Sequence, residues 1–433
     1  MSVVLSILLT LLLLSILVFV HEFGHFIVAK LMGIRVLEFA LFMGPKIFSF
    51  KKGDTVYSLR CIPIGGFCSM EGEESTSKDE KAFSNKPWYK RAAVCVAGPA
   101  MNIILAIVLS VVLFTVSGYS SLQVAEVIPN SPAAIAGVTA GDKIIAVDDS
   151  KVASDTELSV YEGMLPKENG VHVYTIKKAD GTKLKVTAES VAYSGIRTKV
   201  YSKTDAESGV FVGQIEDGSV ASKTDLAEDA EMMKINGASV NNWTEYLYYG
   251  KTSERPLQYV FRNPDGTEVT VDTSVVSEEE PLGNLVYAVF QADEMDHGVF
   301  TMLGDAFSYS FSMIRVTLKS FVWLFNGVAS LDDVSGPVGV VTVVNDTVAA
   351  APSFASGALT FLMLSILISI SLGIFNLLPF PALDGGRLVI AFIEAITRKK
   401  VKPEVEGIIS VVGFVILIGF SILVLIKDII KLF

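Results

Sequence analysis

Cysteine and histidine are both scarce in this sequence, and each shortage restricts what the chain can build. The three cysteines all lie before residue 96, so neither a disulfide framework nor a four-thiolate metal site can be built between residues 120 and 300. Two of the four histidines, His21 and His25, stand close together near the N-terminus, whereas the other two lie between residues 120 and 300. A metal site around the first pair must therefore take a third protein ligand from a carboxylate or a thiolate.

Positive charge is also in short supply. The chain has 35 Lys and Arg against 46 Asp and Glu, which gives a net charge of -11, and residues 201–300 hold 19 acidic but 6 basic side chains. This balance argues against nucleic acid as a partner. The hydrophobic share of 51% is too high for an ordinary soluble enzyme and indicates a membrane protein.

Long uncharged apolar runs predict four transmembrane helices. The first begins with the run Val3–Val20 and ends between Phe26 and Ala29, and the others are expected at 92–116, within Phe354–Leu383 and at Gly407–Ile426. A cleaved signal peptide is the alternative for the first run. No basic segment precedes it, however, and cleavage would discard the polar group that follows, so a retained helix is expected.

Three ionisable side chains, His21, Glu22 and His25, stand at the end of the first apolar run. On a helix the two histidines share one face, so both imidazoles can bind one metal ion while Glu22 lies close enough to act on water. This is the HExxH arrangement of a zinc protease. A chance match is the alternative, but unpaired polar groups within a membrane span would cost several kcal/mol.

The third predicted span ends in a broken helix. Pro379 and Pro381 interrupt it beside two polar residues, Asn376 and Asp384, and irregular backbone at membrane depth is tolerated only where protein or a cavity surrounds it. Asp384 is therefore the best candidate for the third metal ligand, with capping of a helix end as the alternative. In the second span, Asn102 is a buried polar group that either serves near the metal or takes part in simple helix packing.

The distribution of basic residues predicts the topology. Residues 30–91 carry eleven Lys and Arg, and residues 387–402 carry five against one acidic residue, so both loops are expected on the cytoplasmic side. Both termini and the acidic region 120–300 then lie outside. Residues 306–329 are apolar but contain Arg315 and Lys319 on one face, which favours a helix in the membrane interface over a fifth crossing.

The first loop and the external region carry strand signals. Residues 46–59 alternate around a Gly-Asp turn and predict a hairpin apolar enough to enter the membrane, with Gly65 and Gly66 as a further turn. Residues 122–192 and 210–275 repeat weakly and indicate two small β-rich modules. In these modules we interpret Asp142 and Asp229 as turn and surface residues, and His172 and His297 as isolated and exposed.

Three motifs together resemble the site-2 protease family, in particular its bacterial RseP-type intramembrane zinc metalloproteases with PDZ domains. They are HEFGH at 21–25, GPAMN at 98–102 and NLLPFPALDGG at 376–386. The resemblance implies that Zn²⁺ is bound by His21, His25 and Asp384 and that Glu22 is the catalytic base. It also implies that Asn376 helps hold the substrate or the developing oxyanion, and that the hairpin and the turn at Gly65 and Gly66 are membrane-entering elements that pair with an unwound substrate. Together with Asn102 of the second span, these residues form the expected substrate-binding set.

The same resemblance implies a fold and a domain order. The fold expected is a multi-pass α-helical membrane protein with four transmembrane helices, β-rich PDZ-like extramembrane domains and a membrane-associated β-hairpin. The second module departs from the first, with Ala227–Ala230 where the first has Thr139–Asp142. The expected domains are the first two spans with the hairpin (1–118), a PDZ domain (119–195), a second, degenerate PDZ-like domain (205–278), the interfacial helix and its connection (298–350), and the last two spans (351–433).

The function implied is hydrolysis of peptide bonds inside the transmembrane segments of single-span membrane proteins. These substrates, such as anti-sigma factors or remnant signal peptides, would first be shortened by an upstream site-1 protease. The location implied is the lipid bilayer of the bacterial inner membrane, with the PDZ region on the extracytoplasmic side. Two alternatives remain open at this point: a non-catalytic membrane scaffold whose PDZ-like modules collect partners, and a zinc enzyme that acts on lipids or prenylated termini.

Overall fold

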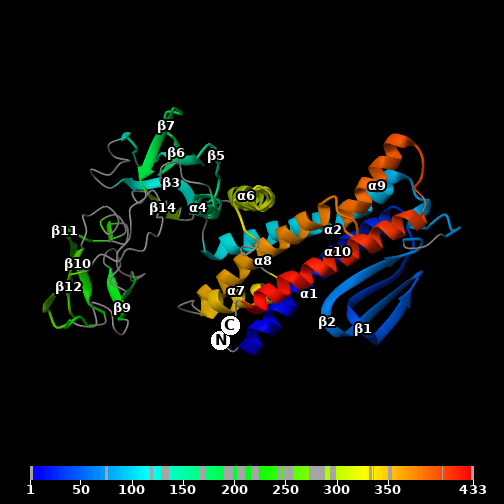
Figure 1. Ribbon diagram of the computed structural model, residues 1–433, viewed down its shortest axis with the longest axis horizontal. Coiled ribbons are helices and arrows are strands. Elements are labelled where there is room, and N and C mark those ends of the chain that lie inside the picture. Colours follow the sequence, from blue (N-terminus) through cyan, green and yellow to red (C-terminus); the bar gives the residue numbers. More distant parts are fainter. Residues whose placement is uncertain are drawn as a thin grey trace. The chain divides into compact units, whose positions relative to one another are not determined.

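The computed structural model divides the chain into two compact units. The first combines Met1–Tyr119 with Met295–Phe433, and the second is Ser120–Glu294. Figure 1 shows the first unit as a group of long helices with a β-hairpin, and the second as β-sheets. The structure describes residues 3–73, 77–117, 120–127, 136–139, 141–164, 171–189, 198–201, 210–215, 224–227, 229–241, 245–246, 249, 257–272, 288–292, 299–330, 334, 336–349, 354–401 and 403–430.

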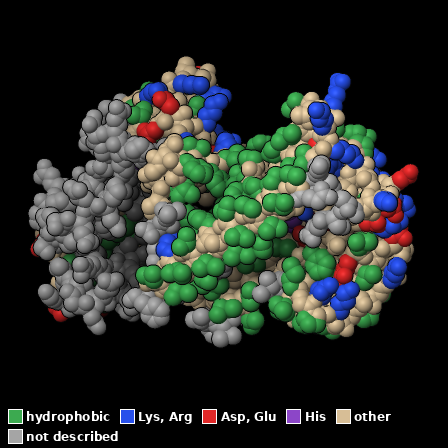
Figure 2. Space-filling model, turned by 45° about the vertical axis from the view of Figure 1, so that its right-hand side comes forward, with side chains coloured by type: hydrophobic (Ala, Val, Ile, Leu, Met, Phe, Trp, Pro, Cys, Tyr) green, Lys and Arg blue, Asp and Glu red, His purple; other side chains and the backbone are tan. Residues whose placement is uncertain are grey.

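Among the described residues, four helices are long and apolar enough to cross a membrane, as predicted. Their outer surfaces are apolar as well: on the last of them Val411 and Val415 are each 63% exposed. Figure 2 shows hydrophobic side chains covering the helical part of the first unit, whereas charged side chains gather near the hairpin. Lipid is the solvent that such a surface fits. The four helices are α1 (Val3–Leu31), α2 (Trp88–Ser117), α8 (Phe354–Leu377) and α10 (Pro403–Ile430).

Helix α2 lies at the centre of the first unit, in contact with α1, α8 and the short helix α9 (Asp384–Thr397). The crossing with α1 is close, because a Cβ atom on Gly24 would lie 2.4 Å from the carbonyl oxygen of Ala97. An ion pair between Arg91 of α2 and Glu394 of α9, both 6% exposed, fixes α9 to α2. Removing either partner would leave a buried charge uncompensated, which is strongly destabilising.

The first loop forms a hairpin that is longer than predicted. Strands β1 (Val36–Lys52) and β2 (Thr55–Met70) meet at the expected Gly-Asp turn. Gly65 and Gly66 lie within β2, at the end of a stretch where this strand reverses direction: Leu59 and Gly66 both pair with Leu41, and Gly65 has a φ of 68°. A Cβ atom at Gly66 would lie 2.8 Å from the carbonyl oxygen of Ala40, so glycine here permits close approach of two strands.

The hairpin folds back on itself and keeps an apolar outer surface. Leu41 of β1 pairs with both Leu59 and Gly66 of β2, so β2 runs along two sides of the first half of β1. Near the tip, Ile47 and Phe48 are 66% and 60% exposed. This surface agrees with the membrane association expected from the sequence, which stays a prediction.

Helix α6 (Val299–Phe325) packs along α2 and α8. The ring centroids of Phe321 and Phe375 are 4.6 Å apart at its contact with α8, and the hydroxyl groups of Ser310 and Ser110 are 3.4 Å apart at its contact with α2. Helix α6 is not one of the four described helices that are apolar enough to cross a membrane. Its place in the membrane interface remains a prediction.

The first turn of helix α7 (Pro337–Ala349) is fixed by α10. The Asp428 carboxylate of α10 accepts hydrogen bonds from the backbone N–H groups of Gly336 and Gly339, at 2.9 and 2.8 Å. A carboxylate at a helix N-terminus satisfies unpaired N–H groups and interacts favourably with the helix dipole. Helix α7 also packs on α8 and α1, so it connects α10 to the rest of the bundle.

The second unit contains two sheets of similar design. The first has the order β14-β3-β4-β6-β7, and the second has the order β13-β12-β10-β9-β8. Strand β14 follows the second sheet in sequence but pairs with β3, so the first sheet is completed by the end of the unit. The PDZ assignment of these modules stays a prediction. The bounds are β3 Ser120–Val127, β4 Lys143–Val147, β5 Ser150–Lys151, α4 Asp155–Met164, β6 Val171–Lys177, β7 Lys183–Glu189, β8 Thr198–Tyr201, β9 Phe211–Ile215, β10 Glu231–Ile235, β11 Ala238–Ser239, β12 Gln258–Arg262, β13 Glu268–Asp272 and β14 Ala288–Ala292.

Two expectations for polar residues of this unit are corrected. His172 is buried, not exposed, and its two ring nitrogens contact the Asp148 carboxylate at 2.5 Å and the Glu162 carbonyl oxygen at 3.0 Å. Pairing of β4 with β6 brings these partners together, which spacing along the chain could not reveal. Asp142 is a turn residue but is buried, and its carboxylate accepts a hydrogen bond from the Thr139 N–H at 2.9 Å. Asp229 lies exposed in a turn, as predicted. The expectation for His297 lies outside the described residues.

Candidate metal centre

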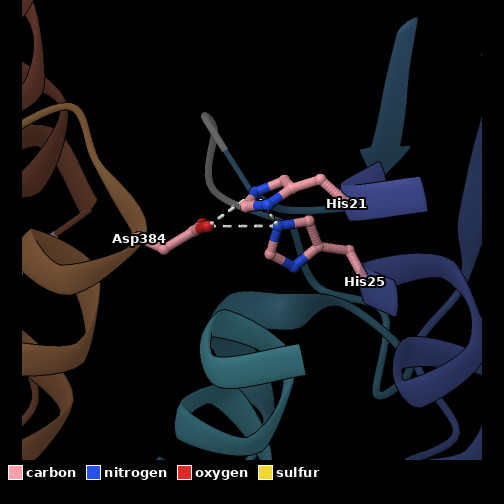
Figure 3. A group of neighbouring side chains, drawn as sticks. All are labelled: His21, His25 and Asp384. Carbon is pink, nitrogen blue, oxygen red and sulfur yellow. Dashed lines mark hydrogen bonds and ion pairs between the residues drawn. The ribbon is translucent and has the colours of Figure 1, made fainter. Parts of the chain in front are cut away.

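Two imidazoles and one carboxylate converge at the meeting of α1 and α9. His21 and His25 lie one turn apart on α1, and their Nε2 atoms are 3.1 Å apart. Asp384, the first residue of α9, places Oδ2 3.1 Å from Nε2 of His21 and 3.2 Å from Nε2 of His25. Figure 3 shows the three side chains pointing at one another from the two helices.

The break between α8 and α9 explains how Asp384 reaches the histidines. Helix α8 ends at Leu377, and the chain turns through Ala382, which has a φ of 75°. Gly385, the second residue of α9, is buried against this turn, where a Cβ atom would lie 2.1 Å from the carbonyl oxygen of Leu378. The residue before the helix, Leu383, makes no side-chain cap, and the Asp384 carboxylate is directed at the imidazoles.

The surroundings of Asp384 keep its carboxylate charged. Burial disfavours the charged form, but hydrogen bonds with His21 and His25, and the positive charge of these rings when they are protonated, outweigh it and hold the pKa of Asp384 below its ordinary value. The carboxylate is therefore ready to act as an anionic ligand at neutral pH. Cys68 is different, because burial, reinforced by the charge of Glu22, raises the pKa of its thiol. A protonated thiol is a poor metal ligand.

The hydrogen bonds behind the two histidines leave their Nε2 atoms free to bind a metal. Nδ1 of His25 lies 2.8 Å from the carbonyl oxygen of Val94, which can only accept, so Nδ1 carries the proton. Behind His21, the amide of Asn102 lies 3.4 Å from Nδ1, and its Oδ1 is buried without a partner. Exchanging the nitrogen and oxygen of this amide lets Oδ1 accept the Nδ1–H of His21, which satisfies both groups.

These observations together test whether a zinc ion fits. When both imidazoles are neutral and carry their proton on Nδ1, three acceptor atoms lie within 3.2 Å of one another, and a cation between them offsets their mutual repulsion. In a tetrahedral zinc site with bonds of about 2.0–2.1 Å, neighbouring ligand atoms are roughly 3.3 Å apart. Gly98 of α2 leaves the necessary space, since a Cβ atom there would lie 2.4 Å from Nε2 of His25. Among the described residues, His21, His25 and Asp384 form the group that could hold a metal ion.

Glu22 borders the same space. A cavity of about 230 Å³ is lined by the three converging residues together with Glu22 and Asn376. Oε2 of Glu22 accepts the backbone N–H of Cys68 in β2 at 2.9 Å. Nδ2 of Asn376 donates to the carbonyl oxygen of Leu372 at 2.9 Å, which uses one of its two N–H groups.

The remaining residues of the predicted substrate-binding set lie elsewhere. Asn102 is fully buried behind His21, where it can orient that imidazole. Gly65 and Gly66 lie in β2 and are not among the residues that line the cavity, although Cys68 and Met70 of the same strand are. Sequence reasoning missed two charged residues that do line it, Glu73 and Arg387. The signal for Arg387 was its spacing, since it follows Asp384 by three residues and so lies on the same face of α9.

Comparison with known proteins gives matches along nearly the whole chain. The model of peptidase family M50 matches residues 9–420. A protein of Clostridium perfringens is 32% identical over 418 residues, which cover 96% of each chain. The zinc metalloprotease RasP of Shouchella clausii is 29% identical over an alignment of 503 positions, which covers 97% of each chain. The regulator of sigma-W protease RasP of Bacillus subtilis is 27% identical over an alignment of 448 positions, which covers 96% of each chain.

Proposed function

Because the chain belongs to peptidase family M50, we propose that it is a zinc metalloprotease that hydrolyses peptide bonds within the membrane-crossing segments of other proteins. The observation that carries this proposal is the convergence of His21, His25 and Asp384 from α1 and α9. The first two belong to a helix apolar enough to cross a membrane, so the reacting bond would lie at membrane depth. Relatives named as zinc metalloproteases support the choice of zinc.

The chain's own residues supply the acid and base chemistry. His21, His25 and Asp384 hold the zinc ion, and Asn102 and Val94 orient the two imidazoles. Zinc bound there polarises a peptide carbonyl and makes water more acidic. Glu22 takes a proton from the attacking water, whose oxygen forms the new bond to the carbonyl carbon. Glu22 then delivers this proton to the nitrogen as the C–N bond breaks, and the second proton of the water follows, so the products are a carboxylate and an ammonium group.

Two features near the cavity suit a peptide substrate. The free N–H of Asn376 can donate to the carbonyl oxygen as negative charge develops on it. A helical substrate hides its carbonyls in hydrogen bonds, so it must first unwind. Strand β2 could receive an unwound segment by β-augmentation close to Glu22, which already contacts the N–H of Cys68 in that strand.

The substrates we propose are single-span membrane proteins that an upstream site-1 protease has already shortened. A relative named regulator of sigma-W protease supports anti-sigma factors as one such class, and remnant signal peptides are another. We place the enzyme in the bacterial inner membrane, with the second unit on the extracytoplasmic side as the charge distribution predicts. The two sheets of that unit, proposed here as PDZ-like modules, would exclude substrates with bulky outer domains.

Deleting residues 120–294 is expected to remove the need for trimming. The deletion has to include the whole second unit, because removal of residues 122–275 alone would leave strand β14 without its partner strand β3. We expect an untrimmed substrate to be cut at least about tenfold faster by the deletion variant than by the full chain. The measurement compares trimmed and untrimmed forms of one substrate in proteoliposomes. Unchanged resistance of the untrimmed form, with the trimmed form still cut, would refute exclusion by the second unit.

A further inference from the structure

A second cavity adjoins the one that holds the candidate metal ligands. It has a volume of about 480 Å³ and lies between the start of α9 and α10, where Glu406 and Ser410 give it a polar lining. Both cavities are lined by Glu73, Ala382 and Arg387, so these residues form the boundary between them. Neither the peptidase chemistry nor the metal site requires this second space.

An ion pair marks the boundary. Nη1 of Arg387 donates to Oε1 of Glu73, while Oε2 of Glu73 accepts the backbone N–H of Met70 at 3.1 Å. The glutamate is therefore anchored to β2 by one oxygen and to α9 by the other. The bond to Glu73 uses one of the five N–H donors that an arginine presents, and a guanidinium can hold a second carboxylate with two parallel hydrogen bonds.

Hydrolysis at the proposed site creates a charge that membrane lipid does not solvate. The new C-terminal carboxylate forms in the first cavity, and an ionised group at membrane depth is costly unless a partner is present. Among the described residues that line either cavity, Arg387 is the one lysine or arginine. It lies one helical turn from Asp384 on α9, on the path from the metal ligands to the second cavity.

We propose that Arg387 binds the carboxylate produced by hydrolysis and passes the new C-terminus into the 480 Å³ cavity. Glu73 holds the guanidinium in place beforehand and yields it to the product by exchange of one carboxylate for another. The proposal rests on the peptidase function argued above. Arg387 is then a product-binding residue, and the Glu73 carboxylate competes with the product carboxylate for its guanidinium group.

The test uses two peptides made from the N-terminal product of a model transmembrane substrate, one ending in a carboxylate and the other in a carboxamide. Inhibition by both is measured with the full-length enzyme. We expect the carboxylate peptide to inhibit the wild type more strongly. Arg387→Gln should lower this preference about tenfold, because a charge-assisted hydrogen bond is lost. Glu73→Gln should raise the preference several-fold, because the competing carboxylate has been removed.

The opposite directions separate this role from a purely structural one. If the ion pair only held β2 to α9, both substitutions would weaken the preference or leave it unchanged, and either result overturns the proposal. A preference that arose from zinc alone would survive Arg387→Gln and would also overturn it. If the Arg387→Gln variant loses its zinc, the Glu73→Gln variant alone tests the proposal. A Glu73→Gln variant whose preference for the carboxylate peptide does not rise would then overturn it. Arg262→Gln, an exposed arginine of β12, is the matched control and should change nothing.

Absence of cleavage by the wild type would overturn the peptidase function and this inference together. Cleavage with an unaltered preference in both variants would overturn the inference alone. The two failures are therefore distinguishable in one set of reactions.

Discussion

Replacing Glu22 with glutamine is expected to slow peptide cleavage about a thousandfold or more while leaving zinc bound. Glutamine has the shape of glutamate but cannot take up a proton, and proton transfer by a positioned side chain contributes roughly 10²–10⁴-fold to a rate. The converging atoms of His21, His25 and Asp384 do not involve Glu22. The measurement is cleavage of a model membrane-helix peptide by purified enzyme, with zinc content determined on the same samples.

The matched control for this experiment is Glu80→Gln. Glu80 is an exposed glutamate of the first loop and is not among the residues that line the 230 Å³ cavity, so its substitution should leave both cleavage and zinc unchanged. A Glu22→Gln variant that keeps more than about a tenth of the wild-type rate would contradict the role of proton carrier. Loss of zinc from that variant would instead show that Glu22 holds the site together.

Replacing Gly98 with alanine is expected to remove zinc and cleavage together. A Cβ atom at this position would lie 2.4 Å from Nε2 of His25 and 2.8 Å from Nε2 of His21. These are the atoms that would bind the metal, so any movement that relieves the overlap takes the imidazoles away from Asp384. We expect the variant to bind zinc at least about a hundredfold more weakly, as judged by competition with a chelator of known affinity, since even changes in the outer shell weaken metal binding by about 10–100-fold.

Gly419→Ala is the control for this substitution. Gly419 also lies in a helix apolar enough to cross a membrane, α10, but among the described residues no atom beyond its chain neighbours and the adjacent backbone of α10 lies within 4 Å of the position that its Cβ would occupy. The helix should therefore accept alanine without change in zinc or activity. Wild-type zinc affinity in Gly98→Ala would refute the fit of the metal against α2.

The elements that sequence predicted best are those that follow from one-dimensional patterns. Uncharged runs of membrane length identified the four apolar helices, because lipid admits few other structures. The spacing of His21 and His25 placed both on one helix face, and the shortage of other histidines directed attention to Asp384. Asp384 lies 363 residues after His21, which it contacts. The sequence still pointed to Asp384, because a predicted helix is broken by prolines beside this carboxylate.

What sequence missed depends on partners that only the fold brings together. Gly65 and Gly66 carry the composition of a turn, but only pairing with Leu41 of β1 shows that the chain reversal falls inside a strand. His172 looked isolated because its partner Asp148 arrives through strand pairing. Glu73 lies in a loop without periodic pattern, and its partner Arg387 is 314 residues away. No local rule could have joined these two.

The central claim is that α1 and α9 jointly bind one zinc ion, and X-ray absorption at the zinc edge of the purified protein tests it most directly. The account predicts one zinc per chain with two imidazole nitrogens and one carboxylate oxygen at about 2.0–2.2 Å. Asp384→Asn should weaken zinc binding and alter the spectrum. A wild-type protein that purifies without stoichiometric zinc, as a non-catalytic scaffold would, contradicts the account. So does an Asp384→Asn variant whose zinc affinity and spectrum match those of the wild type.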